Sequence, residues 1–292
     1  MSRGLDHIVH AVRDLDAAAE FYRRLGFQVG ARNTHPRAWG TQNHIVQLPG
    51  TFVELLSIAD ASGIAPHTPR HFSFGAFNRD FLARGQGFSM LVLAGTGAPD
   101  AEEFRAAGIG DFEPYEFERE GKRPDGATIK VAFALAFASD PRAPETGFFT
   151  CLHRHPENLW NAAFQVHANT AASVAGVAFV AERPNDHQSF FAAFAGVREF
   201  AAMPGGFTIK TPRGDIQVMT PATFGDHYRV APPDTARGAR LAALRFAVHD
   251  LDAVQKLIEQ AGIVLVSANG ALVAGPQAAL GATLVFETDE NR

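Results

Sequence analysis

The chain has 292 residues, of which 46% are hydrophobic and 20% are charged, and its formal net charge is −5. This composition is typical of a soluble globular protein of about two domains, and it excludes a disordered or fibrous chain. Lys and Arg are scattered, so no nucleic acid partner is expected, and no window reaches the roughly 18 apolar residues that a membrane span needs. With no secretory leader and Cys151 as its single cysteine, we expect a cytoplasmic protein held together by packing alone.

The first unit of predicted structure begins after residue 4. An apolar run predicts a strand over residues 5–12, and apolar residues at helical spacing predict a helix over residues 15–25, with Asp14 as its cap and Gly26 as its end. Three more strands are expected over residues 28–31, 41–48 and 51–58. The unit therefore has the order βαβββ.

The βαβββ pattern recurs along the chain. Residues 247–263, AVHDLDAVQKLIEQAGI, repeat residues 11–27, AVRDLDAAAEFYRRLGF, including the Asp-Leu-Asp-Ala step and the final Gly-hydrophobic pair. Two further units fit residues 88–154 and 173–221. Such repetition outweighs any single motif in the choice of a fold.

Four units fill the chain and predict an α+β protein with two halves. We place the boundary in the Ala- and Asn-rich stretch near His167, which gives domains over residues 1–168 and 169–292. The stretch over residues 61–80, between the first two units, is expected to be a loop that packs between units or covers the site as a lid.

The stretches LDHIVHAV (residues 5–12) and GTFVELL (residues 50–56), set on such a unit, resemble the vicinal oxygen chelate (VOC) superfamily. That superfamily includes glyoxalase I, extradiol ring-cleaving dioxygenases and methylmalonyl-CoA epimerase. The segments WGTQNHIV (residues 39–46) and FFTCLHRHPENLW (residues 148–160) resemble its glyoxalase-like branch. The resemblance implies four βαβββ modules paired into two open β-barrel (cup) domains, and a divalent metal held by the first and last strands of each unit.

His7 lies where that superfamily keeps its first metal ligand, and Glu54 lies in the matching last strand between apolar neighbours. A carboxylate in an apolar strand is costly to bury unless it is paired or bound to a metal. The alternative is that Glu54 makes an ordinary ion pair and that His7 is a satisfied core histidine. Imidazole and carboxylate ligands suit Zn²⁺, Ni²⁺, Mn²⁺ or Fe²⁺, so these two residues do not choose the metal.

The second unit departs from the family pattern. Aligning its strands on the first unit sets Ser89 at the His7 position and Cys151 at the Glu54 position, so one donor is missing. His153 follows Cys151 on the same strand face and is the predicted third metal ligand, which completes a set of two histidines and one carboxylate. Cys151 itself is expected to be a small buried hydrophobe.

The second half of the chain lacks donors at the matching positions, which hold Gly176, Ala243, Gln217 and Val285. No metal is expected there. We therefore expect the C-terminal domain to support the first cup or to offer an oligomer surface, which allows a homodimer.

Trp39, Asn43 and Ser89 are the predicted substrate-binding residues, with Trp39 stacking on the substrate and Asn43 hydrogen bonding to it. The alternative for Trp39 and Asn43 is that they close one rim of the cup. The predicted catalytic base is Glu54, or else Glu157 in the turn that follows His155.

Three functions are compatible with these residues. The first is a metal-dependent lyase or isomerase of glyoxalase or epimerase type, in which the metal acts as a Lewis acid on a small substrate with neighbouring oxygens. The second is an Fe²⁺ extradiol ring-cleaving dioxygenase. The third is a metal-free binding or sequestration protein, which the neutral Ser89 favours. The chain has no Gly-rich phosphate loop, so no nucleotide cofactor is expected.

Overall fold

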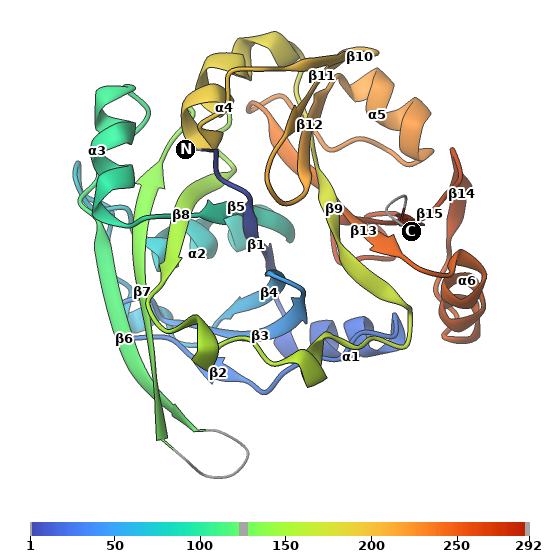
Figure 1. Ribbon diagram of the computed structural model, residues 1–292, viewed down its shortest axis with the longest axis horizontal. Helices are drawn as coiled ribbons and strands as arrows, with labels where there is room; N and C mark the ends of the chain where they lie inside the picture. The colour runs from blue at the N-terminus through green and yellow to red at the C-terminus, as the bar shows by residue number, and fades with distance from the viewer. Residues whose placement is uncertain (1, 123–127, 290–292) are drawn as a thin grey trace.

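The computed structural model describes residues 2–122 and 128–289 and contains two mixed eight-stranded sheets with helices (Figure 1). Strands β1–β8 form the first sheet and strands β9–β16 form the second. Each sheet joins two βαβββ units, so the predicted α+β fold with two cups is confirmed. None of the helices in these residues is both long and apolar enough to cross a bilayer.

The first half of the chain carries the first sheet and three helices. Its elements are β1 (Leu5–Ala11), α1 (Leu15–Arg24), β2 (Asn33–Thr34), β3 (Thr41–Leu48), β4 (Thr51–Ile58), α2 (Phe74–Arg84), β5 (Gly87–Ala94), α3 (Ala98–Ala106), β6 (Tyr115–Lys122), β7 (Thr128–Ala138) and β8 (Gly147–His153). The short turns η2 (Pro156–Asn158) and η3 (Ala162–Gln165) lead out of it.

The second half repeats this arrangement, with longer first strands, β9 and β13, and shorter last strands, β12 and β16. Its elements are β9 (Ala171–Val180), η4 (Pro184–His187), α4 (Gln188–Ala195), β10 (Ala201–Met203), β11 (Gly206–Lys210), β12 (Asp215–Met219), α5 (Pro221–Tyr228), β13 (Arg240–Val248), α6 (Leu251–Gln260), β14 (Val266–Ala268), β15 (Ala271–Ala274) and β16 (Thr283–Thr288). The division into domains at residue 168 stays a prediction, because a shared core joins the two sheets.

Two sequence-based expectations about local structure were wrong. No strand forms over residues 28–31, where Gly30 is held by single contacts: its N–H donates to Ile45 O, and its carbonyl accepts from the His44 ring. The second correction is α2, which lies in the stretch expected to be a loop. The Ser73 hydroxyl accepts from the Ala76 N–H and caps this helix, whose buried face starts with Phe74.

Each sheet is built around an antiparallel pair of first strands. The order in the first sheet is β2-β3-β4-β1-β5-β8-β7-β6, and the second sheet has the same order with β9 and β13 at its centre. Within every unit the first strand runs parallel to the last, as β1 does to β4. The edge strands are β2 and β6 in the first sheet and β10 and β14 in the second. Each sheet curls between its edge strands and so forms a cup.

Buried aromatic side chains hold the two halves together. One core cluster contains residues of both sheets, and in it the ring of Phe27 lies 4.8 Å from that of Phe246, centroid to centroid. A separate cluster lines the inside of each cup. In the second cup, Phe224 and Tyr228 of α5 are buried in that inner cluster. The halves therefore pack back to back (Figure 1), and α5 helps to fill the second cup.

His10 is a fully buried histidine in the region where the two halves meet. Its Nδ1 lies 2.9 Å from the Tyr22 hydroxyl and its Nε2 lies 3.2 Å from Leu280 O, so both ring nitrogens have partners. Burial lowers the pKa of His10 to about 4, although the bond to Leu280 opposes this shift. The unfolded chain therefore takes up this proton first as the pH falls, and the stability that neutral His10 contributes is lost between about pH 6.5 and pH 4.

We predict that His10→Phe makes unfolding less dependent on pH. The corresponding positions in the second half already hold Phe179 and Phe246, so the ring fits this kind of core. Between pH 7.5 and pH 4.5 the wild type should lose about 2–3 kcal/mol more of its free energy of unfolding than the variant, from the linkage of one buried histidine. Urea unfolding at the two pH values measures this difference. Equal losses in both proteins would contradict the assignment.

Candidate active site

A β-bulge in β1 places two titratable residues on the same face of the sheet. In the pairing of β1 with β5, Leu5 lies opposite Leu93 and His7 lies opposite Val92, which leaves Asp6 as an extra residue. A bulge breaks the strict alternation of side chains and re-aims one of them. Asp6 therefore reaches the ring of its neighbour, and the His7 Nδ1 lies 2.6 Å from Asp6 Oδ1.

The Asp6 carboxylate lies between two imidazoles. It is 3% exposed, and its oxygens lie 2.6 Å from His7 Nδ1 and 2.9 Å from His153 Nε2. Burial raises the pKa of Asp6, but the hydrogen bonds from His153 and His7 outweigh it and hold the pKa well below its usual range. An ionised carboxylate only accepts hydrogen bonds, so His7 carries a proton on Nδ1 and presents Nε2 to the cup.

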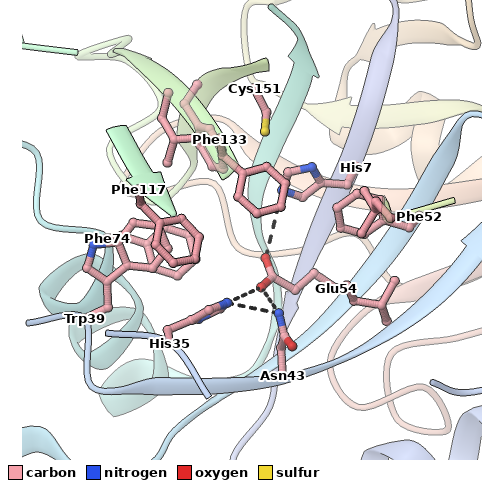
Figure 2. A pocket seen from close by; sticks show the side chains of 14 residues that line it. His7, His35, Trp39, Asn43, Phe52, Glu54, Phe74, Phe117, Phe133 and Cys151 are labelled. Atoms are coloured by element: carbon pink, nitrogen blue, oxygen red, sulfur yellow. Dashed lines mark hydrogen bonds and ion pairs between the residues drawn. The ribbon is translucent and has the colours of Figure 1, made fainter. Parts of the chain in front are cut away.

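His7 opens onto a cavity of about 580 Å³ inside the first cup (Figure 2). Its ring stacks on Phe52, with ring centroids 4.3 Å apart. Further walls come from rings carried by α2, by the loop before β3 and by strands β6, β7 and β8, namely Phe74, Trp39, Phe117, Phe133 and Phe149. The cavity is thus aromatic on most sides, and its titratable groups gather at one end.

Glu54 faces His7 across that end. Its carboxylate is 5% exposed, and Oε1 accepts a hydrogen bond of 2.5 Å from Asn43 Nδ2. Oε1 also lies 3.5 Å from His35 Nε2, and Oε2 lies 3.9 Å from His7 Nε2 (Figure 2). Asn43 Nδ2 also lies 3.1 Å from His35 Nε2, so one amide group fixes both neighbours. His35 Nδ1 is in turn 2.8 Å from the Thr41 hydroxyl.

The structure brings together His7, Glu54, Trp39 and Asn43 of the residues singled out in the sequence. His153 lies behind His7, where its Nε2 is engaged by Asp6 and its Nδ1 is buried with no hydrogen-bond partner.

The other predicted residues lie away from this cavity or have a different role. The Ser89 hydroxyl donates to Asn78 Oδ1 of α2. Glu157 lies on the exposed turn η2, 3.5 Å from His155 Nδ1. Cys151 does line the cavity, but burial, with Asp6 and Glu54 nearby, raises the pKa of its thiol, so it remains protonated.

Sequence reasoning missed Asp6 and His35. Asp6 adjoins His7, but a regular strand would have turned it to the opposite face. His35 precedes Pro36 in a loop, where no periodic pattern indicates direction. For Asp6 the available signal was that a carboxylate stands directly before a histidine in the sequence.

The strand register shows which residues correspond to His7 and Glu54 in the other units. A second bulge, at Ser89 in β5, mirrors the one at Asp6, so the counterpart of His7 is Met90. Met90 pairs with Gly147 on the neighbouring strand, as His7 pairs with Phe52. Glu54 stands two residues after Phe52, so its counterpart is Phe149, two residues after Gly147.

The second sheet gives the same result. Gly176 and Ala243 follow the corresponding bulges in β9 and β13, and Gln217 and Val285 take the Glu54 position, as the sequence alignment had them. Within the residues that the structure describes, the first unit is therefore the one that has both a histidine and a carboxylate at these positions.

These donors fit a divalent cation between His7 and Glu54. Two ligands that each bind a metal at about 2.1 Å and at a tetrahedral angle lie roughly 3.4 Å apart, so the 3.9 Å between His7 Nε2 and Glu54 Oε2 needs only a small closure. Asp6 behind His7 is the carboxylate-imidazole arrangement that orients a metal-binding histidine. His35 is the next imidazole within reach of Glu54.

A second group of potential ligands lies behind this pair. Among the described residues, the group of three whose ligand atoms all come within 4.8 Å of one another is Asp6, Cys151 and His153. Binding there would require Cys151 to lose its proton and would compete with the hydrogen bond between His153 and Asp6. A cation between His7 and Glu54 would need neither change.

Similar structures have the VOC fold. A hypothetical protein from Staphylococcus aureus is 12% identical, with a TM-score of 0.68 over 98% of this chain and 100% of that one. A mutant of 4-hydroxymandelate synthase from Streptomyces coelicolor is 12% identical, with a TM-score of 0.58 over 100% and 94%. A xylose isomerase-like TIM barrel/4-hydroxyphenylpyruvate dioxygenase fusion protein is 12% identical, with a TM-score of 0.50 over 91% and 40%. At this identity the likeness shows the fold alone.

A match to a protein-family model identifies the family of this chain. The glyoxalase-like domain model matches residues 5–194, more than half of the chain, so the chain belongs to the glyoxalase-like domain family. The resemblance to the VOC superfamily is thereby confirmed. No curated protein matches the chain.

We predict that Glu54→Gln stabilises the metal-free protein. The amide keeps an acceptor for Asn43 and removes a buried charge whose second oxygen has His7 Nε2 only at 3.9 Å. After dialysis against a chelator, the free energy of unfolding in urea should rise by about 1 kcal/mol. Glu157→Gln on the exposed turn is the control and should leave it unchanged. A loss of stability in Glu54→Gln would instead make the carboxylate part of a structural ion pair.

Proposed function

We propose that the chain is a divalent-metal-dependent enzyme of VOC type, a lyase or isomerase of glyoxalase or epimerase character that acts on a small substrate with neighbouring oxygens. The observation that supports this most is the buried Asp6–His7–Glu54 arrangement at the polar end of an otherwise aromatic cavity. A metal bound there would supply Lewis acid chemistry, which stabilises negative charge on a substrate oxygen.

In this proposal each residue at the polar end has a separate role. His7 and Glu54 hold the metal, and Asp6 orients His7 through Nδ1. His35 is proposed as the third ligand, because its Nε2 lies 3.5 Å from Glu54. The sequence predicts His153 in that place, but this ligand would first have to leave Asp6. The ligands suit Zn²⁺, Ni²⁺, Mn²⁺ or Fe²⁺.

The proposed base is Glu54. Asn43 donates to Oε1 and so fixes one end of the carboxylate. Oε2 would take a proton from a bound substrate once it has left the metal. Glu157, the alternative base, lies outside the cavity. The aromatic walls keep water away from the site, which strengthens each charge interaction in it.

Two other functions have an observation in their favour. The aromatic walls suit the flat substrate of an Fe²⁺ ring-cleaving dioxygenase, which would consume oxygen during turnover. Met90 and Phe149 at the counterpart positions favour a metal-free binding protein, whose affinity for its ligand would not change in His7→Ala. The cytoplasmic location and a homodimer remain proposals from the sequence.

We predict that metal content separates the two metal-dependent enzymes from the metal-free binding protein. His7→Ala and Glu54→Ala should purify with less than about a tenth of the wild-type metal, because each removes a direct ligand. Asp6→Asn should weaken metal affinity about 10- to 100-fold, because the His7 ring loses its orienting carboxylate. Elemental analysis and competition with a chelator dye measure both effects.

Two histidine variants decide the third ligand. His35→Ala should lower metal affinity strongly, whereas His153→Ala should act only through Asp6 and resemble Asp6→Asn. His155→Ala, at the partly exposed residue before the turn η2, is the control. If His7→Ala has the same metal content as the wild type, the metal-dependent enzyme is contradicted. The metal-free binding protein then remains as the function.

A further inference from the structure

A second pocket lies beside the aromatic cavity, along the same two strands. Asn43, Ile45 and Gln47 alternate along β3 and so share one face of it, as Phe133, Val131 and Ile129 do along β7. Asn43 and Phe133 line the aromatic cavity. Gln47 and Ile129 line a pocket of about 710 Å³ beside it. We call this space the outer pocket; its apolar wall consists of Ile45, Ile129, Val131, Leu159 and Phe164.

Ile45 and Leu159 line both spaces, so their side chains lie at the boundary between them, which we call the neck. The backbone at the neck is tied to both strands. Gln47 Nε2 donates to Leu159 O at 2.8 Å, and Asn158 Nδ2 donates to Lys130 O at 2.9 Å. The segment after β8 therefore bridges β3 and β7, and it holds the Leu159 side chain at the junction.

The outer pocket is uncharged. Its described lining includes the amides of Asn33, Gln47 and Asn158 but no Lys, Arg, Asp or Glu side chain. Phe164 is one of the large apolar side chains that stay exposed, with 40% of its surface open to solvent. An apolar group that enters from the cavity would cover this ring and the adjoining Ile129 and Val131.

We propose that the outer pocket is a subsite for an uncharged apolar tail of the substrate, and that Leu159 determines how long a tail is accepted. The substrate would be a ring with neighbouring oxygens at His7 and Glu54, held between the aromatic walls, with an alkyl-type substituent passing between Ile45 and Leu159. Asn43 and Gln47 lie four residues apart on β3, so the polar end and the outer pocket are about 13 Å apart. The placing of the oxygens rests on the proposed function, and the choice of a ring rests on its dioxygenase alternative; the tail subsite rests on neither.

The test is calorimetric binding of catechol and its 4-methyl, 4-butyl and 4-hexyl derivatives to the metal-loaded full chain under anaerobic conditions. Each added methylene that enters the subsite should tighten binding roughly two- to fourfold. Leu159→Trp fills the neck and should hold the ratio of butyl to methyl affinity within about twofold of one, whatever its effect on the affinity for catechol itself. A carboxylate at the end of the tail should abolish the gain.

A second variant keeps the test independent of folding at the neck. Phe164→Ser should lower the affinity of the hexyl derivative alone, whereas Val264→Ser, which removes another exposed apolar side chain, should change nothing. Affinity that does not vary with tail length, or a tail gain that persists in Leu159→Trp, would overturn the subsite. So would the absence of binding by every derivative.

His7→Ala and Glu54→Gln separate this inference from the proposed function. If both variants bind every derivative as the wild type does, and the tail gain is still lost in Leu159→Trp, the metal site is wrong and the subsite stands. If both variants weaken all derivatives equally and tail length has no effect, the proposed function stands and the subsite is wrong.

Discussion

The buried Asp6 carboxylate is the constraint on which the site depends. It stays ionised because His153 and His7 both donate to it, and this fixes the plane of the His7 ring and turns Nε2 toward Glu54. A regular strand would place this carboxylate in the core shared by Leu5 and Ile8, where a charge has no partner. The β1 bulge is therefore a condition for the chemistry of the cup.

The four units share one backbone plan but differ in what they place at the ligand positions. Met90, Gly176 and Ala243 stand where the first unit has His7, and each packs in a cup without needing a charged partner. In the second cup Phe224 and Tyr228 of α5 are buried in the inner cluster, as Phe74 of α2 is in the first. One half thus carries the cavity, and the aromatic core holds the other half against its back.

The fold was accessible from sequence because it rests on repeated local signals. Asp14 and Asp250 both cap a helix that follows a first strand, and a glycine follows the C-cap of both helices. The site was accessible only in part. Glu54 stood out as a carboxylate in an apolar strand, whereas the role of Asp6 depends on one extra residue in a strand, which hydrophobic alternation does not reveal. The same limit explains why Ser89 was aligned with His7 in place of Met90.

The most direct measurement of this account is the tautomer of His7. In ¹⁵N-labelled, metal-free protein at neutral pH, long-range proton–nitrogen spectra, assigned by comparison with His7→Gln, report which ring nitrogen carries the proton. The account predicts a protonated Nδ1 and a bare Nε2 whose resonance shifts when a divalent metal is added and stays in place in Glu54→Ala. A proton on Nε2, or an Nε2 resonance that metal does not move, would contradict it.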